Sequence, residues 1–343
     1  MPCNLVSLIR ILILAVFSTT APSGFAKSTT TTDRSSAGVG ERHAHLNYTE
    51  ALLLGLVEGV TEYLPISSTG HLILINHLLG LDADSSDRDG RQGSFAAAEK
   101  IQGQSPRRAA INAYTIVIQA GSIAAVLLLY RRRLREMLQG LLGQSREGLL
   151  VVRNLVAAFL PAAAAGPLLG TIVAECLFHP KAVGIALVAG AFLMRCVERR
   201  QQRKEERKGA WGGERGSELH ELSLKAAVGI GVLQCFALWP GTSRSMMTLV
   251  GGYLAGFRPP QAAEFSFLLG LVTLSAAAGY TIWQNGSIMI EVLPLGPAIL
   301  GGFTAAVAAA VAVKGLVALL TRKGLSLFIG YRLCLGSVVL VFL

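Results

Sequence analysis

The sequence contains few charged residues for its length. Charged side chains make up 15% of its 343 residues and hydrophobic side chains make up 52%, whereas a soluble domain carries about 25% charged residues. Cysteines are also few, and the five that occur are scattered without the spacing of a metal site. The composition therefore excludes an ordinary soluble domain, predicts neither a disulfide framework nor a zinc centre, and indicates an integral membrane protein.

Acidic residues are fewer than basic ones, which leaves a net charge of +10. A basic protein can bind nucleic acid, but here Lys and Arg gather in two short runs, residues 131–135 and 195–208, each directly after an apolar segment. That placement is typical of loops on the cytoplasmic side of a membrane. We therefore predict a multi-pass membrane protein with no nucleic-acid partner.

The N-terminal 45 residues differ from the rest of the chain. Arg10, an apolar stretch at 11–17 and the small residues before Lys27 resemble a secretory signal. Residues 1–26 are therefore predicted to be a signal-like segment, with an uncleaved anchor as the alternative, and the Ser- and Thr-rich residues 27–45 are predicted to be a disordered polar linker. The remainder is predicted to form a single membrane-embedded domain, residues 46–343.

Six apolar stretches approach the length of about 20 residues that a spanning helix needs. They are residues 109–130, 149–173, 181–198, 262–283, 293–320 and 325–343. If the spans alternate in direction, every dense basic run falls on the same side of the membrane. The sequence thus predicts an all-α polytopic membrane protein with six transmembrane helices.

Two further apolar regions, residues 46–81 and 222–258, are too interrupted to be spans. Glu58, Glu62 and Pro65 divide the first, and a Pro-Gly pair divides the second. Because the alternation holds only if each region enters and leaves on one face, we predict two re-entrant helical hairpins that enter from opposite faces. Irregular backbone at membrane depth requires enclosure by protein or a wet cavity.

Both interrupted regions share the pattern Pro, any residue, Ser or Thr, then Ser. Combined with opposite entry sides, this pattern predicts inverted-topology halves at about residues 46–173 and 181–343. In such proteins the functional site lies at the interface of the halves, near the membrane midplane.

Glu58 and Glu62 are four residues apart, so on a helix their side chains lie on one face. Two carboxylates that close repel each other unless a positive charge lies between them. A divalent cation such as Mg²⁺ or Ca²⁺ fits, because these ions take carboxylate oxygens and are often shared with substrate phosphates. A shared proton with acid or base use, and an ion pair between one Glu and Arg244, are the alternatives.

Hydroxyl side chains follow the proline in both motifs, at Ser67, Ser68, Thr69, Thr242 and Ser243. They can cap a helix that restarts there, and its free N–H groups and positive dipole end favour an anion. Two such helix N-termini predict a phosphate site, with ordinary capping as the alternative.

Arg244 and His71 add charge and proton transfer to these motifs. The planar guanidinium of Arg244 matches phosphate oxygens in pairs, which predicts an oxyanion clamp. His71 can move a proton, or it can be a satisfied structural group in an apolar segment. A divalent metal, an arginine and hydroxyl groups can together stabilise the charge of a phosphate group. Because the surrounding sequence is apolar, this combination favours hydrolysis or translocation of a lipid-linked phosphate.

Residues 58–71 (EGVTEYLPISSTGH) resemble the first signature of the undecaprenyl-diphosphatase family, also called bacitracin-resistance proteins. Residues 239–245 (WPGTSRS), with Thr248, resemble the second. The resemblance implies an enzyme of the bacterial inner membrane, with its site facing the periplasm, that hydrolyses undecaprenyl diphosphate to undecaprenyl phosphate and inorganic phosphate. The product is the lipid carrier for peptidoglycan and other envelope glycans, and the activity gives bacitracin resistance.

The resemblance also implies roles for individual residues. It gives Glu58 and Glu62 as the family's acidic motif, and Ser68, His71, Ser243, Arg244, Ser245 and Thr248 as its other polar positions. Together with the residue chemistry above, we predict Glu58 and Glu62 as metal ligands, Glu62, Ser68, His71 and Arg244 as catalytic, and Ser67, Thr69, Thr242, Ser243, Ser245 and Thr248 as phosphate-binding. We predict that the attacking group is either a hydroxyl, Ser68 first, or a water molecule positioned by His71 or by one of the Glu residues. The predicted partners are a lipid diphosphate and membrane lipid, a homodimer is left open, and the rival function is an undecaprenyl phosphate flippase.

Overall fold

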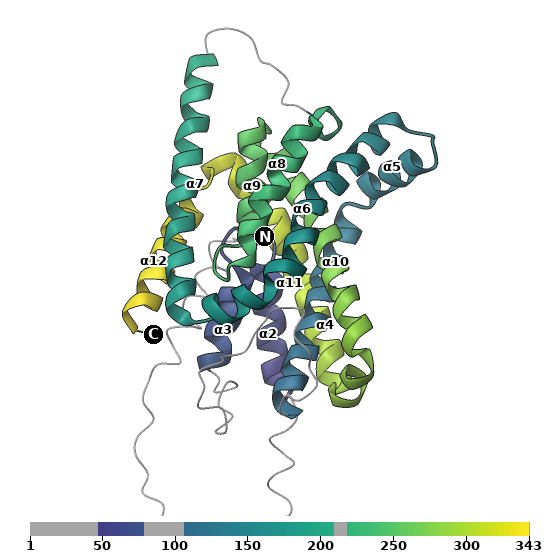
Figure 1. Ribbon diagram of the computed structural model, residues 1–343, viewed down its shortest axis with the longest axis vertical. Helices are drawn as coiled ribbons and strands as arrows, with labels where there is room; N and C mark the ends of the chain where they lie inside the picture. The colour runs from purple at the N-terminus through teal and green to yellow at the C-terminus, as the bar shows by residue number, and fades with distance from the viewer. Residues whose placement is uncertain (1–46, 79–105, 209–217, 343) are drawn as a thin grey trace, which may run out of the picture.

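The computed structural model describes residues 47–78, 106–208 and 218–342, and the regular structure within these ranges is entirely helical. The predicted signal-like segment and polar linker, residues 1–26 and 27–45, lie outside the described residues. In Figure 1 most of the helices stand roughly side by side along the long axis of the molecule, as expected of a membrane bundle.

The helices fall into a long and a short group. The long helices are α4 (Pro106–Leu129), α6 (Arg146–Leu177), α7 (Pro180–Lys208), α10 (Pro259–Val292) and α11 (Leu295–Lys323). The short helices are α2 (Tyr48–Thr61), α3 (Ser68–Leu78), α5 (Arg131–Leu141), α8 (Leu224–Cys235), α9 (Arg244–Ala255) and α12 (Ser326–Phe342), with the 3-10 turns η1 (Leu219–Glu221) and η2 (Phe236–Leu238).

The predicted spans correspond to the five long helices and α12. Each long helix contains a stretch long and apolar enough to cross a membrane. The sixth predicted span is α12, an apolar helix of 17 residues, somewhat below the usual length of about 20. The prediction of an all-α polytopic membrane protein is therefore confirmed, while the direction of each crossing stays a prediction.

The two basic runs, predicted as loops, are helical, so that prediction is wrong in its local structure. Residues 131–135 begin α5, and residues 195–208 continue α7 without a break. Arg and Lys are good helix formers, and in α5 Leu134 and Met137 pack against the main core while Arg132 stays exposed. Figure 1 shows α5 and the end of α7 at the same end of the molecule.

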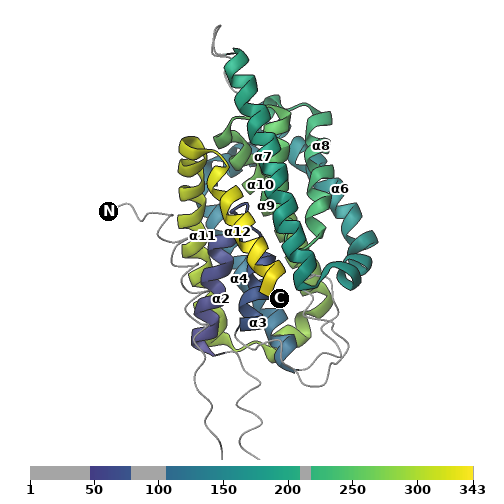
Figure 2. The ribbon, with the colours of Figure 1, turned by 90° about the vertical axis from the view of Figure 1, so that its left-hand side faces the viewer.

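Two pairs of short helices interrupt the bundle at the predicted places. Residues 62–67 separate α2 from α3, and η2 with residues 239–243 separates α8 from α9. In Figures 1 and 2, α2 and α3 occupy the lower half of the molecule, whereas α8 and α9 occupy the upper half. The opposite directions predicted for the two halves, about 46–173 and 181–343, stay a prediction.

Small residues hold α2 against α11. A Cβ atom added at Gly55 would lie 2.4 Å from the carbonyl oxygen of Gly301, and one added at Gly59 would lie 2.4 Å from that of Ala305. Helices approach this closely only where side chains are small. Because Glu58 belongs to the same turn of α2, this packing also fixes the direction of its side chain.

The second pair is anchored in a similar way to a different span. A Cβ atom added at Gly231, on α8, would lie 2.3 Å from the carbonyl oxygen of Ala158 on α6. The two interrupted pairs are thus held by separate long helices, and the first residues of α9 contact the first break, where Ser245 donates to the carbonyl of Leu64.

Gly55→Ala should lower the free energy of unfolding by about 1 to 3 kcal/mol, because the added methyl group overpacks the contact with α11. Gly279→Ala, on α10, is the matched control, since an added Cβ meets nothing within 4 Å there and alanine gains about 0.5 to 1 kcal/mol in a helix. Thermal unfolding in detergent compares the two variants. Equal unfolding midpoints would contradict the close α2–α11 packing.

Candidate active site

The breaks of both helix pairs face one cavity of about 140 Å³. The two motifs contact each other there, although Glu62 and Arg244 are 182 residues apart. Seven predicted site residues line the cavity: Glu58, Glu62, Ser67, Ser68, Thr69, Ser243 and Arg244. Four others, His71, Thr242, Ser245 and Thr248, are buried in the same region but do not form its wall.

The last turn of α2 positions the two carboxylates. The helix continues through Glu58 and ends at Thr61, and the N–H of Glu62 still donates to the carbonyl of Glu58 at 2.9 Å. This bond confirms that both side chains lie on one helix face. Since Glu58 is 2% exposed and Glu62 is 8% exposed, both carboxyl groups lie inside the protein.

The helices that restart after the breaks begin in the same way. Ser67 precedes α3 with φ of 75°, and Ser243 precedes α9 with φ of 76°; within the described ranges they are the only non-glycine residues with positive φ. Each side chain accepts a backbone hydrogen bond from the residue three positions on, Gly70 at 3.2 Å and Met246 at 3.3 Å. Such backbone costs about 1 to 3 kcal/mol and persists where its surroundings enforce it.

This geometry corrects the predicted correspondence between the motifs by one residue. Alignment on the prolines pairs Ser68 with Ser243, whereas the helix starts pair Ser67 with Ser243 and Ser68 with Arg244. The difference arises in the second break, where Gly241 adopts a left-handed conformation with φ of 91°. The first residue of α3 therefore brings a hydroxyl group to the cavity, and the first residue of α9 brings a guanidinium.

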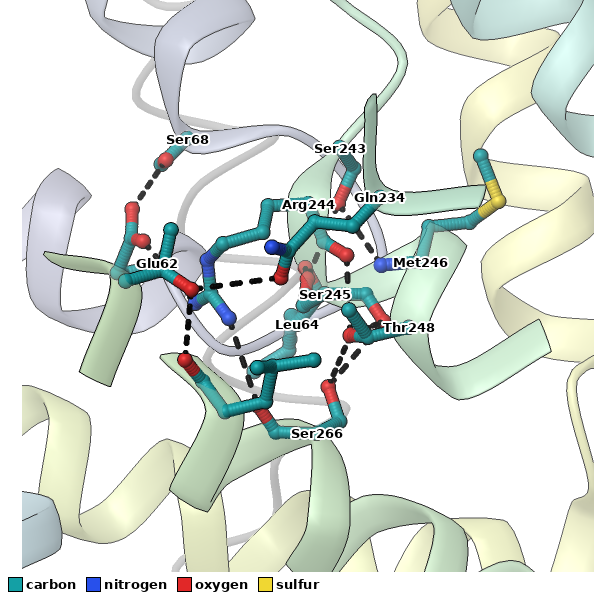
Figure 3. A network of polar contacts seen from close by, with 12 residues as sticks. Glu62, Leu64, Ser68, Gln234, Ser243, Arg244, Ser245, Met246, Thr248 and Ser266 are labelled. Carbon is teal, nitrogen blue, oxygen red and sulfur yellow. Dashed lines mark hydrogen bonds and ion pairs between the residues drawn. The ribbon is translucent and has the colours of Figure 1, made fainter. Parts of the chain in front are cut away.

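Ser68, Glu62 and Arg244 form a chain of polar contacts between the two breaks (Figure 3). The hydroxyl of Ser68 donates to Glu62 Oε2 at 2.5 Å, and Arg244 Nη2 lies 3.2 Å from Glu62 Oε1. One of the alternatives predicted for the two carboxylates, an ion pair between one Glu and Arg244, is present in the structure. The carboxylate that makes it is Glu62. A hydroxyl held by a carboxylate is also the pattern of a nucleophile beside its general base.

Two buried atoms of the cavity residues have no hydrogen-bond partner within the described part of the chain: Glu58 Oε2 and Arg244 Nε. Buried polar groups are nearly always paired, so each atom is suited to a ligand. The two carboxylates offer the oxygen ligands of a hard divalent cation that also binds phosphate. Since the described residues hold no cluster of three or more His, Cys, Asp or Glu, such an ion would need further ligands from substrate or water.

Helix α10 and a neighbouring ring fix the place of Arg244. Its Nη1 donates to the carbonyl of Ser266 at 3.4 Å. A Cβ atom added at Gly270 would lie 2.3 Å from Nη1, and the guanidinium carbon is 5.8 Å from the ring centroid of Tyr63. The guanidinium is therefore enclosed on several sides before any ligand binds.

Behind the cavity wall, Ser245 connects the two motifs and Thr248 connects the second motif to α10. The Ser245 hydroxyl donates to the carbonyl of Leu64 at 2.7 Å. Thr248 donates to the carbonyl of Arg244 at 3.0 Å and lies 2.6 Å from the hydroxyl of Ser266. Their predicted role in phosphate binding stays a prediction, as does that of Thr242.

His71 is buried with both ring nitrogens engaged by the protein. Nδ1 lies 2.6 Å from the carbonyl oxygen of Ser67, and Nε2 lies 2.6 Å from the hydroxyl of Tyr331, whose ring stacks on the imidazole at a centroid distance of 5.6 Å. This geometry favours the structural alternative, and the catalytic role of His71 stays a prediction.

Four residues at or near the site, Thr115, Gln119, Tyr331 and Arg332, are absent from the predicted site. Arg332 carried a usable signal, because an arginine inside an apolar segment marks a functional position. Thr115 and Gln119 line the cavity from α4, but an uncharged polar residue in a long helix gives no comparable signal.

Comparison with known proteins decides the family. The model described as "Bacitracin resistance protein BacA" matches residues 51–338, a range that includes both motifs and the whole cavity. This chain belongs to the BacA family. The predicted resemblance is therefore confirmed.

Several curated relatives of this BacA-family chain are named undecaprenyl-diphosphatase. The protein of Bordetella avium is 34% identical over 301 residues, which cover 87% of this chain and 98% of the relative. Those of Sorangium cellulosum and Nitrosomonas europaea are each 37% identical over 292 residues, covering 85% of this chain and 85% and 93% of the relatives.

Ser243→Ala should destabilise this BacA-family protein more than Ser243→Gly does. Alanine removes the capping hydrogen bond, which is worth about 1 kcal/mol of stability, and it keeps the strained positive φ. Glycine at a cap position costs only about a few tenths of a kcal/mol, and it adopts positive φ without strain. Ser223, the cap of α8 with φ of −68°, is the control, because glycine relieves no strain there. Thermal unfolding in detergent should give Ser223→Gly the larger loss of the two glycine variants; the reverse order would contradict strain at Ser243.

Proposed function

We propose that this chain hydrolyses undecaprenyl diphosphate to undecaprenyl phosphate and inorganic phosphate. The name of its relatives, undecaprenyl-diphosphatase, supports both substrate and reaction. The observation that carries the proposal is the contact of Ser68 with Glu62, and of Glu62 with Arg244, in a cavity within an apolar bundle. The family is described as bacitracin resistance proteins. This description agrees with the proposal, because hydrolysis of undecaprenyl diphosphate is the activity expected to give bacitracin resistance.

In the first half of the reaction Ser68 is the nucleophile and Glu62 is its base. As the Ser68 oxygen bonds to the terminal phosphorus, its proton passes to Glu62 Oε2, which already accepts it at 2.5 Å. The bond between that phosphorus and the bridging oxygen breaks. Undecaprenyl phosphate leaves with the bridging oxygen, and the terminal phosphoryl group stays on Ser68.

In the second half water releases the phosphoryl group. Glu62 has passed its first proton to the departing lipid phosphate, so it can accept a proton from the attacking water. It returns this proton to the Ser68 oxygen as inorganic phosphate forms. The cycle consumes one water molecule and restores both side chains. The placement of the His71 ring away from the cavity wall gives no support to water activation by that residue.

Arg244 and the two helix starts stabilise the charge that develops on the phosphoryl oxygens. Among the described residues Arg244 Nε is a buried donor without a partner, and guanidinium groups bind phosphate through paired N–H donors. The N-termini of α3 and α9 add positive dipole ends and the N–H groups of a first turn, which have no partner inside the helix. Donors fixed before binding require no rearrangement in the transition state.

A divalent cation, Mg²⁺ or Ca²⁺, would be held by Glu58 and Glu62. When bound, it would neutralise phosphate oxygens and reduce repulsion between the diphosphate and the carboxylates. The unpaired Oε2 of Glu58 is the observation that supports this cofactor.

The cavity lies nearer the face opposite the basic runs. Gln119 and Thr115 line it, and at a rise of about 1.5 Å per residue they lie about 18 and 24 Å along α4 from Arg131. Since a bilayer core is about 30 Å thick, this depth is beyond the midplane. With the basic runs in the cytoplasm, the site faces the periplasm of a bacterial inner membrane.

Translocation of undecaprenyl phosphate is the alternative function. Its support is the placement of the two interrupted helix pairs in opposite halves of the bundle (Figures 1 and 2), an arrangement that transporters use for alternating access. Movement of the lipid across vesicles without release of phosphate would favour it over hydrolysis.

Ser68→Ala, Glu62→Gln and Arg244→Ala should each lower phosphate release from undecaprenyl diphosphate by about 100-fold or more, because each removes a transition-state interaction. The assay uses purified protein in detergent with Mg²⁺ or Ca²⁺, and a chelator should abolish release. Arg195→Lys, in an ion pair with Glu198 outside the cavity wall, is the control and should keep the wild-type rate. Full activity of Ser68→Ala would exclude the covalent route.

Ser287→Cys should react with a membrane-impermeant maleimide in intact cells, whereas Arg132→Cys should react only after permeabilisation. Both positions are exposed, but they lie toward opposite ends of the bundle, at the end of α10 and the start of α5. The measurement requires a background in which the native cysteines are replaced by serine. Reaction of Arg132→Cys in intact cells would reverse the proposed orientation.

A further inference from the structure

Arg332 is a charged residue inside the bundle that the proposed chemistry does not use. It lies on α12 and is 0% exposed. A buried guanidinium costs several kcal/mol unless its donors are paired. The hydrogen bonds that pair these donors must therefore offset the cost of burying the guanidinium.

All four hydrogen bonds of Arg332 within the described structure go to backbone carbonyl oxygens. Two of these bonds reach α7: Nε donates to Leu187 at 3.2 Å and Nη2 donates to Ala186 at 3.0 Å. The other two reach the two helix breaks, since Nη1 donates to Pro65 at 3.3 Å and Nη2 donates to Gly241 at 2.9 Å. One side chain thus bonds to both breaks.

The two acceptors in the breaks occupy equivalent places. Pro65 lies two residues before Ser67, and Gly241 lies two residues before Ser243, so each acceptor lies at the same distance before a helix start that borders the cavity. Because the guanidinium is rigid and planar, bonds from Nη1 and Nη2 fix the separation of these two carbonyl groups. Lysine, with one rotatable ammonium group, cannot reproduce this fork.

The space for the guanidinium is provided by a glycine on α7. A Cβ atom added at Gly190 would lie 2.2 Å from Arg332 Nη2 and 2.9 Å from its central carbon. The preceding residue of α12, Tyr331, contacts the first helix pair through His71. Helix α12 therefore supports both breaks from one side.

We propose that Arg332 is a positioning residue that sets the separation of the two helix starts, and through them the alignment of Ser68 and Glu62 with Arg244. It touches none of the reacting atoms. The inference rests on the proposed function for its kinetic test, and its structural consequence can be measured without activity. A displacement of about 1 Å between reacting groups can cost about 100-fold in rate.

Arg332→Lys and Gly190→Ala should each lower kcat for phosphate release by about 10- to 100-fold, with a smaller change in KM. The first removes the fork, and the second displaces it while leaving the charge in place. In the double variant kcat should be close to that of Arg332→Lys alone, because lysine lacks the guanidinium that the new methyl group displaces most, and the remaining close neighbour, Met246 Cε at 3.0 Å, is the end of a flexible side chain. Such non-additivity is expected only for residues that act on one contact.

Gly184→Ala is the matched control for packing between α7 and α12. An added Cβ there would lie 2.8 Å from the side chain of Leu340 on α12, so it disturbs the same helix pair without touching Arg332. It should keep the wild-type kcat even if its unfolding midpoint falls. A kcat in Gly190→Ala equal to that in Gly184→Ala, or losses that multiply in the double variant, would overturn the proposal.

Spin labels test the same inference without any enzymatic assay. Labels at Leu52→Cys on α2 and Val232→Cys on α8, both exposed positions, report the separation of the two interrupted pairs in a background lacking the native cysteines. Arg332→Lys should shift or broaden this distance distribution, and Gly184→Ala should not. An unchanged distribution in Arg332→Lys refutes the positioning role, whereas absence of phosphate release by the wild type refutes only the proposed function.

Discussion

The ion pair between Glu62 and Arg244 is the interaction on which the rest of the structure depends. Either charge alone among apolar helices would cost several kcal/mol, and the two residues are 182 positions apart in sequence. They can meet only because two helices end inside the bundle. Each ending requires an interruption of the helix, a serine cap in a left-handed conformation, and glycine contacts that hold the broken helices against neighbouring spans.

Much of the architecture could be predicted because it follows from local properties of the chain. Apolar runs of spanning length give the long helices, and the spacing of Glu58 and Glu62 places both carboxylates on one helix face. The motif at 58–71 identified the family, and the cavity gathers most of its polar residues. These features depend on residues close together in sequence.

The remaining features depend on contacts that no local pattern encodes. Which carboxylate meets Arg244 depends on the rotation of α2, and the contact of Gly55 with Gly301 sets that rotation. The orientation of His71 depends on Tyr331, 260 residues away. The shift in correspondence between the motifs follows from the conformation of Gly241, which a short alignment does not reveal. The helical conformation of residues 131–135 could not be predicted from their charge, because a run of basic residues indicates the side of the membrane and not the backbone conformation.

The left-handed serines that begin α3 and α9 also bear on how a catalytic cycle would end. The helix starts that border the cavity are fixed before any ligand arrives, so their amide groups lose little freedom on binding, which strengthens the binding of an anion. On the proposed chemistry, freed inorganic phosphate meets the same donors that held it as part of the lipid. On that chemistry, tight binding of the product would make release of phosphate, rather than cleavage of the anhydride, the step that governs turnover.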